Sequence, residues 1–137
     1  MNAKERGDLA AGYFDSGMNC AQSVYCAFAE DFGVDKETAA KLASGLGGGV
    51  GRLREVCGAV SAAALVLGHR FGPDKAKVYP EVQRFAEEFK REFGSIVCRE
   101  LLEGTGATTG GAPEPRTSEY KRVRPCANFV RFVAEHL

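Results

Sequence analysis

Hydrophobic residues recur at intervals of three and four positions through most of the chain, and no alternating run of β-branched residues is long enough to indicate a strand. The clearest example is residues 80–93, where Val82, Phe85 and Phe89 share one face and charged residues take the other. Helices are predicted at residues 3–15, 20–32, 36–44, 57–71, 80–93, 96–102 and from 125 to the C-terminus. The pattern therefore predicts an all-α fold, a helical bundle of about six or seven helices in which residues 1–137 form a single domain.

Two segments interrupt this helical pattern. Residues 45–51 hold five glycines, but their spacing fails the dinucleotide fingerprint and no P-loop Lys-Ser/Thr pair follows. We interpret the cluster as a site of close backbone packing beside Cys57, and an anion-binding nest with Arg52 and Arg54 is the alternative. Residues 103–117 are rich in Gly, Thr and Pro and predict a loop longer than most connections.

Composition and charge exclude several classes of function. The chain carries 18 basic and 18 acidic side chains, so it lacks the basic excess of a nucleic-acid-binding protein, and no nucleic-acid partner is expected. The longest apolar stretch, residues 56–67, is shorter than the roughly 20 residues that cross a bilayer, so no membrane insertion is expected. Residues 1–8 are charged and contain no export signal, which predicts a cytoplasmic location.

The five cysteines are the main chemical signal in the sequence. They are Cys20, Cys26, Cys57, Cys98 and Cys126, and an odd number in a cytoplasmic chain argues against a purely structural disulfide framework. All except Cys26 fall in the first turn of a predicted helix. Free amides and the positive end of the helix dipole stabilise a thiolate there and lower the cysteine pKa.

The predicted helix starts also place arginines beside these cysteines. Asn19 is the predicted cap before Cys20, Ser95 caps the helix that contains Cys98, and Pro125 precedes Cys126. The neighbouring cations are Arg52, Arg54, Arg99, Arg122 and Arg124. Since a thiolate both attacks disulfides and binds metals, this pattern is typical of redox chemistry and of metal ligation alike.

The cysteine spacing excludes the common local motifs. No Cys-x-x-Cys occurs, so the chain has neither a thioredoxin-type motif nor paired zinc knuckles, and the haem-attachment motif is also absent. Neither His69 nor His136 has a cysteine or carboxylate nearby at the spacing of metal ligands, so both are interpreted as structural or surface residues. The dispersed thiols can meet only through folding. In a third interpretation, the cysteines merely pack in a helical interaction module.

Several segments together resemble the C-GCAxxG-C-C family of redox-active proteins. They are residues 19–24, the glycine cluster, residues 57–62, Cys98 and Cys126, and the resemblance covers almost the whole chain. It implies that Cys20, Cys57, Cys98 and Cys126 are the four signature cysteines and that Cys26 lies outside the set. One departure is Ala62, which stands where the family has glycine. A related domain in longer redox proteins looks able to hold an iron–sulfur cluster, which keeps that cofactor open.

We therefore predict thiol–disulfide chemistry by the four signature cysteines, in which one thiolate attacks and a second cysteine resolves the mixed disulfide. Cys57, which lies between arginines and the glycine cluster, is favoured as the attacking residue. In the alternative, the same four thiolates ligate a metal ion or a [2Fe–2S] cluster. The redox partner is not identified by the sequence, and the predicted helix of small residues at 57–71 is compatible with a homodimer.

Overall fold

The computed structural model describes all 137 residues and contains eight α-helices and no strands, so the predicted all-α fold is confirmed. The helices exceed the predicted six or seven because a short helix, α7, had not been expected. The α-helices are α1 Ala3–Asp15, α2 Cys20–Ala29, α3 Lys36–Ala43, α4 Gly58–Phe71, α5 Lys75–Phe93, α6 Cys98–Leu101, α7 Ser118–Val123 and α8 Cys126–His136. Two 3₁₀ turns, η1 Glu30–Phe32 and η2 Ser44–Leu46, extend α2 and α3.

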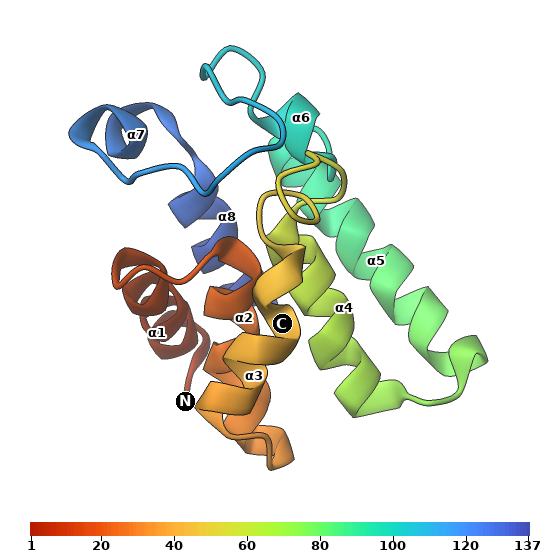
Figure 1. Cartoon of the computed structure of the whole chain (residues 1–137). Helices are drawn as coiled ribbons and strands as arrows, with labels where there is room; N and C mark the ends of the chain where they lie inside the picture. Colours follow the sequence, from red (N-terminus) through yellow and green to blue (C-terminus); the bar gives the residue numbers. More distant parts are fainter.

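Helix α2 lies at the centre of the bundle. It contacts α1, α3, α4 and α8, while α5 packs along the outer side of α4 (Figure 1). From Ser23 to Ala29 every residue of α2 is buried. A helix with neighbours on all sides needs apolar or small residues around its whole circumference, which is what this segment supplies.

Helix α4 is the close neighbour of α2, as its small residues had indicated. Gly58, Ala59, Ala62 and Ala63 are all buried, and small side chains let two helix backbones approach each other closely. Ala62, at the position where the family has glycine, is fully buried within the core. Its additional methyl group is therefore accommodated inside the bundle.

The start of helix α5 differs from the prediction. Helix α5 begins at Lys75, where the Asp74 side chain accepts a hydrogen bond from the Ala76 amide, and Pro80 lies inside the helix. The proline removes only one helical hydrogen bond, and this end of α5 is exposed to water, which limits the cost. The prediction that the helix starts near Pro80 is therefore wrong.

The short helices also needed correction. Helix α6 begins at Cys98, so Ser95 is not its cap; the Ser95 hydroxyl instead accepts from the Val97 amide and pairs with Glu100. Helix α7 was missed because none of its residues is buried and it has no hydrophobic period, although Thr117 caps it. Residues 103–117 form the predicted loop.

One end of the bundle collects the irregular segments. The glycine loop (residues 45–55), α6 and the segment 103–117 all lie at the end where α2, α4 and α8 begin (Figure 1). Two backbone hydrogen bonds join the C-terminal end of the glycine loop to the start of α6. The Cys57 amide donates to Ile96 O at 2.8 Å, and the Cys98 amide donates to Glu55 O at 2.5 Å. These bonds hold two of the four signature cysteines side by side.

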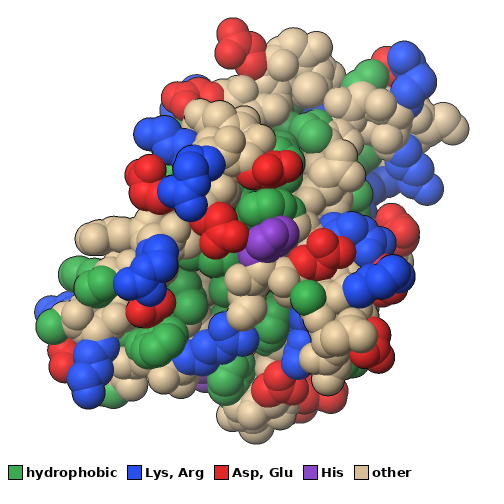
Figure 2. All heavy atoms as spheres, turned by 180° about the vertical axis from the view of Figure 1, so that it is seen from behind, with side chains coloured by type: hydrophobic (Ala, Val, Ile, Leu, Met, Phe, Trp, Pro, Cys, Tyr) green, Lys and Arg blue, Asp and Glu red, His purple; other side chains and the backbone are tan.

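The surface carries charges of both signs. Figure 2 shows, on the face opposite to that of Figure 1, acidic and basic side chains interspersed around hydrophobic ones, in agreement with the net charge of zero. None of the helices combines the length and the apolar character that a membrane crossing requires.

Candidate functional site

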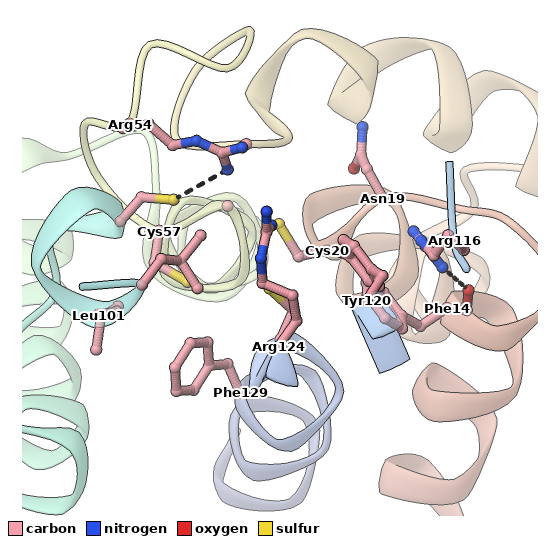
Figure 3. Close-up of a pocket in the computed structure, with 15 residues that line it drawn as sticks. Phe14, Asn19, Cys20, Arg54, Cys57, Leu101, Arg116, Tyr120, Arg124 and Phe129 are labelled. Carbon is pink, nitrogen blue, oxygen red and sulfur yellow. Dashed lines mark hydrogen bonds between the residues drawn. The ribbon is translucent and has the colours of Figure 1, made fainter. Parts of the chain in front are cut away.

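The four cysteines at helix starts line one cavity of about 70 Å³, here called the cysteine cavity (Figure 3). Cys20, Cys98 and Cys126 are the first residues of α2, α6 and α8, and Cys57 immediately precedes α4. Cys26 is buried in the middle of α2 and does not line the cavity. The fold therefore brings together the four residues that the sequence singled out and leaves out the fifth. The cavity has room for only a few water molecules or a small chemical group.

The position of Cys20 is set by a helix cap. The Asn19 side chain accepts a hydrogen bond from the Gln22 amide at 2.8 Å, and the Gln22 side chain accepts one from the Asn19 amide at 2.9 Å. The side-chain amide nitrogen of Asn19 also donates a hydrogen bond to Ser44 O at 3.0 Å. The prediction that Asn19 caps α2 is confirmed, and the bond to Ser44 ties this helix start to η2.

Glycines permit the close packing around two of the sulfurs. A Cβ atom at Gly58 would lie 2.5 Å from Cys20 Sγ, and one at Gly49 would lie 2.7 Å from Cys98 Cβ. Gly49 also has a φ of +72°, which side chains rarely tolerate. The glycine cluster is a site of close packing, as predicted, but the cysteine that its Gly49 approaches is Cys98 rather than Cys57.

The alternative interpretation, an anion nest in the glycine loop, could not use the amides of residues 50–55. The amides of residues 50–55 all donate to carbonyl oxygens of residues 45–50 within the same loop. Nests bind anions with backbone N–H groups that are free of other partners. The loop instead uses these groups to stabilise its own turns.

Arg54 is the cation that reaches a cavity sulfur. It is 5% exposed, and its Nη1 lies 3.7 Å from Cys98 Sγ as a hydrogen-bond donor (Figure 3). Its Nε donates to Thr108 O at 2.9 Å, which fixes the guanidinium in place. The sequence placed Arg54 next to Cys57, but the turn of the glycine loop directs its side chain to Cys98.

Burial opposes ionisation of three of the cavity thiols. It raises the pKa of Cys57 well above its usual value, although the amides of Ala59 and Val60 act in the opposite direction. Burial also raises the pKa of Cys20, and it raises that of Cys126 to about 12. Here the loss of hydration outweighs the amides at the helix starts. The expectation that these helix starts lower the pKa is therefore wrong for these three residues.

A single carboxylate holds three arginines at the mouth of the cavity. Glu114 Oε1 accepts from Arg52 at 2.5 Å and from Arg54 at 2.7 Å, and Oε2 accepts from Arg124 at 2.5 Å. The side chains of Arg54 and Arg124 are only 7% and 6% exposed. Figure 3 shows Arg54 reaching into the cavity from the glycine loop and Arg124 from the start of α8.

Sequence reasoning missed Glu114 and two other residues of this region. Glu114 is one of two acids in the loop 103–117, and nothing local distinguishes it; only the excess of arginines near the cysteines suggested that a carboxylate was needed. Tyr120 on α7 faces Cys126 as a hydrogen-bond donor, and burial raises its pKa to about 12. Arg116 donates to the carbonyl groups of Phe14 and Met18 and closes the side of the cavity near α1.

The same residues were tested for a metal site. Four thiols are the right donors in number and type for a zinc or iron–sulfur centre. In this structure, however, no group of three or more His, Cys, Asp or Glu side chains is arranged to hold a metal ion, and all five cysteines are free thiols. The arrangement does not fit a preformed metal centre.

Comparison with known proteins gave one result. No curated protein and no solved structure matched the chain. Residues 18–137 match the family model described as "Putative redox-active protein (C_GCAxxG_C_C)". This range includes all four cavity cysteines, Glu114 and its three arginines, and it confirms the resemblance seen in the sequence. The chain belongs to the C_GCAxxG_C_C family.

Proposed function

We propose that the protein carries out thiol–disulfide exchange and that Cys98 is its attacking residue. The contact between the Arg54 guanidinium and Cys98 Sγ, inside a cavity that holds three further thiols, is the observation that carries the proposal. A guanidinium donor favours a negatively charged sulfur, which is the nucleophilic form of cysteine. Cys57, which the sequence favoured, has no such partner, and burial raises its pKa.

Cys20 and Cys126 are the candidates for the resolving thiol. A negative charge on Cys98 raises the pKa of both, so both lie close enough to Cys98 to respond to its charge. Each also has a donor that stabilises its anion when it reacts, the Gly48 amide for Cys20 and the Tyr120 hydroxyl for Cys126. Until then their raised pKa keeps them protonated, so one thiolate is formed at a time.

The proposed exchange takes place in two displacements. The Cys98 thiolate attacks one sulfur of a substrate disulfide, forms a mixed disulfide and releases the first substrate thiolate. The resolving thiolate then attacks Cys98 Sγ, which releases the second substrate thiolate and leaves an intramolecular disulfide. The substrate gains two electrons and two protons, and the protein loses them. The cycle ends when a second dithiol reduces the protein disulfide.

Two neighbours of the thiols argue against purely structural cysteines. That alternative expects sulfurs without polar or cationic partners, packed as small hydrophobic groups. Arg54 contacts Cys98, and the Tyr120 hydroxyl faces Cys126. Cysteines that only pack as small hydrophobic groups have no need of either neighbour.

The test uses the reduced protein and the neutral probe 4,4′-dithiodipyridine, whose released thiopyridone is followed by stopped-flow absorbance. We expect a fast first release in the wild-type protein that Cys98→Ser abolishes and Arg54→Gln slows by about tenfold, the value of one charge-assisted hydrogen bond. Arg99→Gln is the matched control, because Arg99 adjoins Cys98 in sequence but its side chain is 55% exposed and pairs with Glu55.

The second release reports the resolving step. Cys20→Ser and Cys126→Ser are compared. The variant that lacks the resolving thiol should stop after the first thiopyridone release and accumulate the mixed disulfide, which mass spectrometry detects. Retention of the fast phase and of the intramolecular disulfide in Cys98→Ser would refute the proposal.

A further inference from the structure

A second hollow adjoins the cysteine cavity and is not used by the exchange chemistry described above. It has a volume of about 480 Å³, within the range of small-molecule sites, and unlike the cysteine cavity it is lined mainly by glycines and by polar or charged residues. The residues shared by the two hollows are Asn19, Gly48, Arg54, Arg116, Tyr120 and Arg124. No cysteine lines the larger hollow, so a molecule in it would be separated from the thiols by these shared residues.

The charge of this hollow is strongly one-sided. Its lining includes Arg52, Arg54, Arg116 and Arg124, and the only carboxylate among the lining residues is Glu114. Four guanidinium groups against one carboxylate leave an excess of three positive charges, in a chain whose net charge is zero. We call this hollow the arginine cleft.

Burial makes this excess informative. The side chains of Arg52, Arg54 and Arg124 are 14%, 7% and 6% exposed, so water solvates them poorly. Buried charges of one sign require compensating groups. Glu114 compensates one of them, and a Cys98 thiolate beside Arg54 would compensate another. The remaining positive charge is available to an anion from outside the chain.

The contacts of Glu114 show which anion the cleft suits. Its two carboxylate oxygens already take hydrogen bonds from three arginines at 2.5–2.7 Å, so the guanidinium groups are positioned for planar carboxylates. Arg116 adds a further cation on the α1 side of the cleft, and only the carbonyl groups of Phe14 and Met18 accept from it.

We propose that the arginine cleft binds a small disulfide that carries carboxylate groups and delivers its sulfur–sulfur bond to Cys98. This inference rests on the proposed function and assigns its substrate class. The carboxylates bind Arg52, Arg116 and Arg124 and are unchanged by the reaction. The disulfide accepts two electrons from Cys98 and the resolving thiol and leaves as two thiols, as in the exchange above.

The kinetic test compares three disulfides of similar size and different charge. They are 3,3′-dithiodipropionate, bis(2-hydroxyethyl) disulfide and cystamine, which are a dianion, neutral and a dication. Each rate with the wild-type protein is divided by the rate of the same probe with dithiothreitol, which corrects for intrinsic reactivity. We expect the dianion to be favoured over the neutral probe by about tenfold or more, and the preference to fall as salt is raised.

Variants locate the preference in the cleft. Arg116→Gln and Arg52→Gln should each lower the ratio of dianion to neutral rates several-fold. Arg122→Gln is the matched control, because Arg122 on α7 is 71% exposed, pairs with Glu119 and does not line the cleft; it should keep the wild-type ratio. A wild-type ratio of one or less overturns the proposal, whatever the variants do.

Binding without chemistry separates this inference from the proposed function. Calorimetric titration uses 3,3′-thiodipropionate, a thioether dicarboxylate that cannot exchange, and inorganic phosphate. Binding of the thioether with no reduction of any disulfide would refute the thiol mechanism but support the carboxylate site. Disulfide reduction that ignores charge, with no thioether binding, would overturn the inference and leave the mechanism standing. Tighter binding of phosphate than of the dicarboxylate would also overturn it.

Discussion

The carboxylate of Glu114 should be the main electrostatic support of the site, and Glu114→Gln tests this. The substitution keeps the size of the side chain but removes the charge that faces Arg52, Arg54 and Arg124 at 2.5–2.7 Å. Three guanidinium groups then face one another without an anion. Because the loop 103–117 contacts the glycine loop largely through Arg52, Arg54 and Glu114, the change should also loosen that loop.

The magnitude follows from the burial of the partners. Breaking a fully buried ion pair costs about 3–5 kcal/mol, whereas exposed pairs contribute about 0–1 kcal/mol. Glu114 keeps 21% of its side chain exposed, so we expect a loss of about 2 kcal/mol from the free energy of unfolding. With an unfolding entropy of about 0.29 kcal/mol/K for a chain of this length, the melting temperature should fall by about 7 °C.

The effect should depend on pH in a defined direction. Burial raises the pKa of Glu114, but hydrogen bonds from Arg52 and the charge of Arg124 outweigh it, so the folded value lies below the ordinary 4.5. The unfolded chain therefore binds the proton more readily, and the contribution of the carboxylate is complete above 4.5 and is lost as pH falls through the lower folded value. The gap between wild type and variant should close in that range.

Differential scanning calorimetry at a series of pH values measures both effects, and hydrogen exchange of residues 103–117 reports the loosening of the loop. Glu119→Gln is the matched control, since Glu119 pairs with Arg122 at 2.6 Å with both side chains about 70% exposed. A melting temperature within a degree of wild type at pH 7, or a gap that does not narrow as pH is lowered below 4.5, would refute the reasoning.

Two further predictions concern the packing around the cysteines. Gly58→Ala should lower the free energy of unfolding, measured in urea, by about 1–3 kcal/mol, because the new methyl group meets Cys20 Sγ. Gly68→Ala on the same helix has open space and should raise that free energy by about 0.5–1 kcal/mol. Equal effects of the two substitutions would contradict the assigned packing. Cys26→Ala should lower the melting temperature but keep the fast thiopyridone release, since Cys26 is buried away from the cavity. Loss of that fast phase would show that the fifth cysteine takes part.

The helices that could be predicted are those whose signals are local. Asn19 caps α2 as expected, and the hydrophobic period of α5 places Phe85 and Phe89 in the core. Helix α7 has no buried face, so it had no period to detect. Pro80 misled the reading of α5 because proline marks a helix start in most contexts, although here it lies inside an exposed segment.

The residues of the candidate site likewise include some that local sequence signals could predict and others that they could not. Four cysteines at helix starts could be selected from sequence because caps and first turns are set by neighbouring residues. The choice of Cys57 as the attacking residue lost its basis because Arg54 contacts Cys98, a residue 44 positions away. Glu114 lies 60 positions from Arg54, and no local pattern connects them.

The sequence alone determined the all-helical class, the start of α2 after the Asn19 cap, and the set of cysteines that the family shares. These depend on hydrogen bonds and side-chain periods within a few residues of each position. Tertiary structure decided the electrostatics, namely which sulfur meets a guanidinium, which thiols are kept protonated by burial, and where positive charge accumulates. Ionisation depends on the whole surroundings of a group, and those surroundings come from segments far apart in the chain.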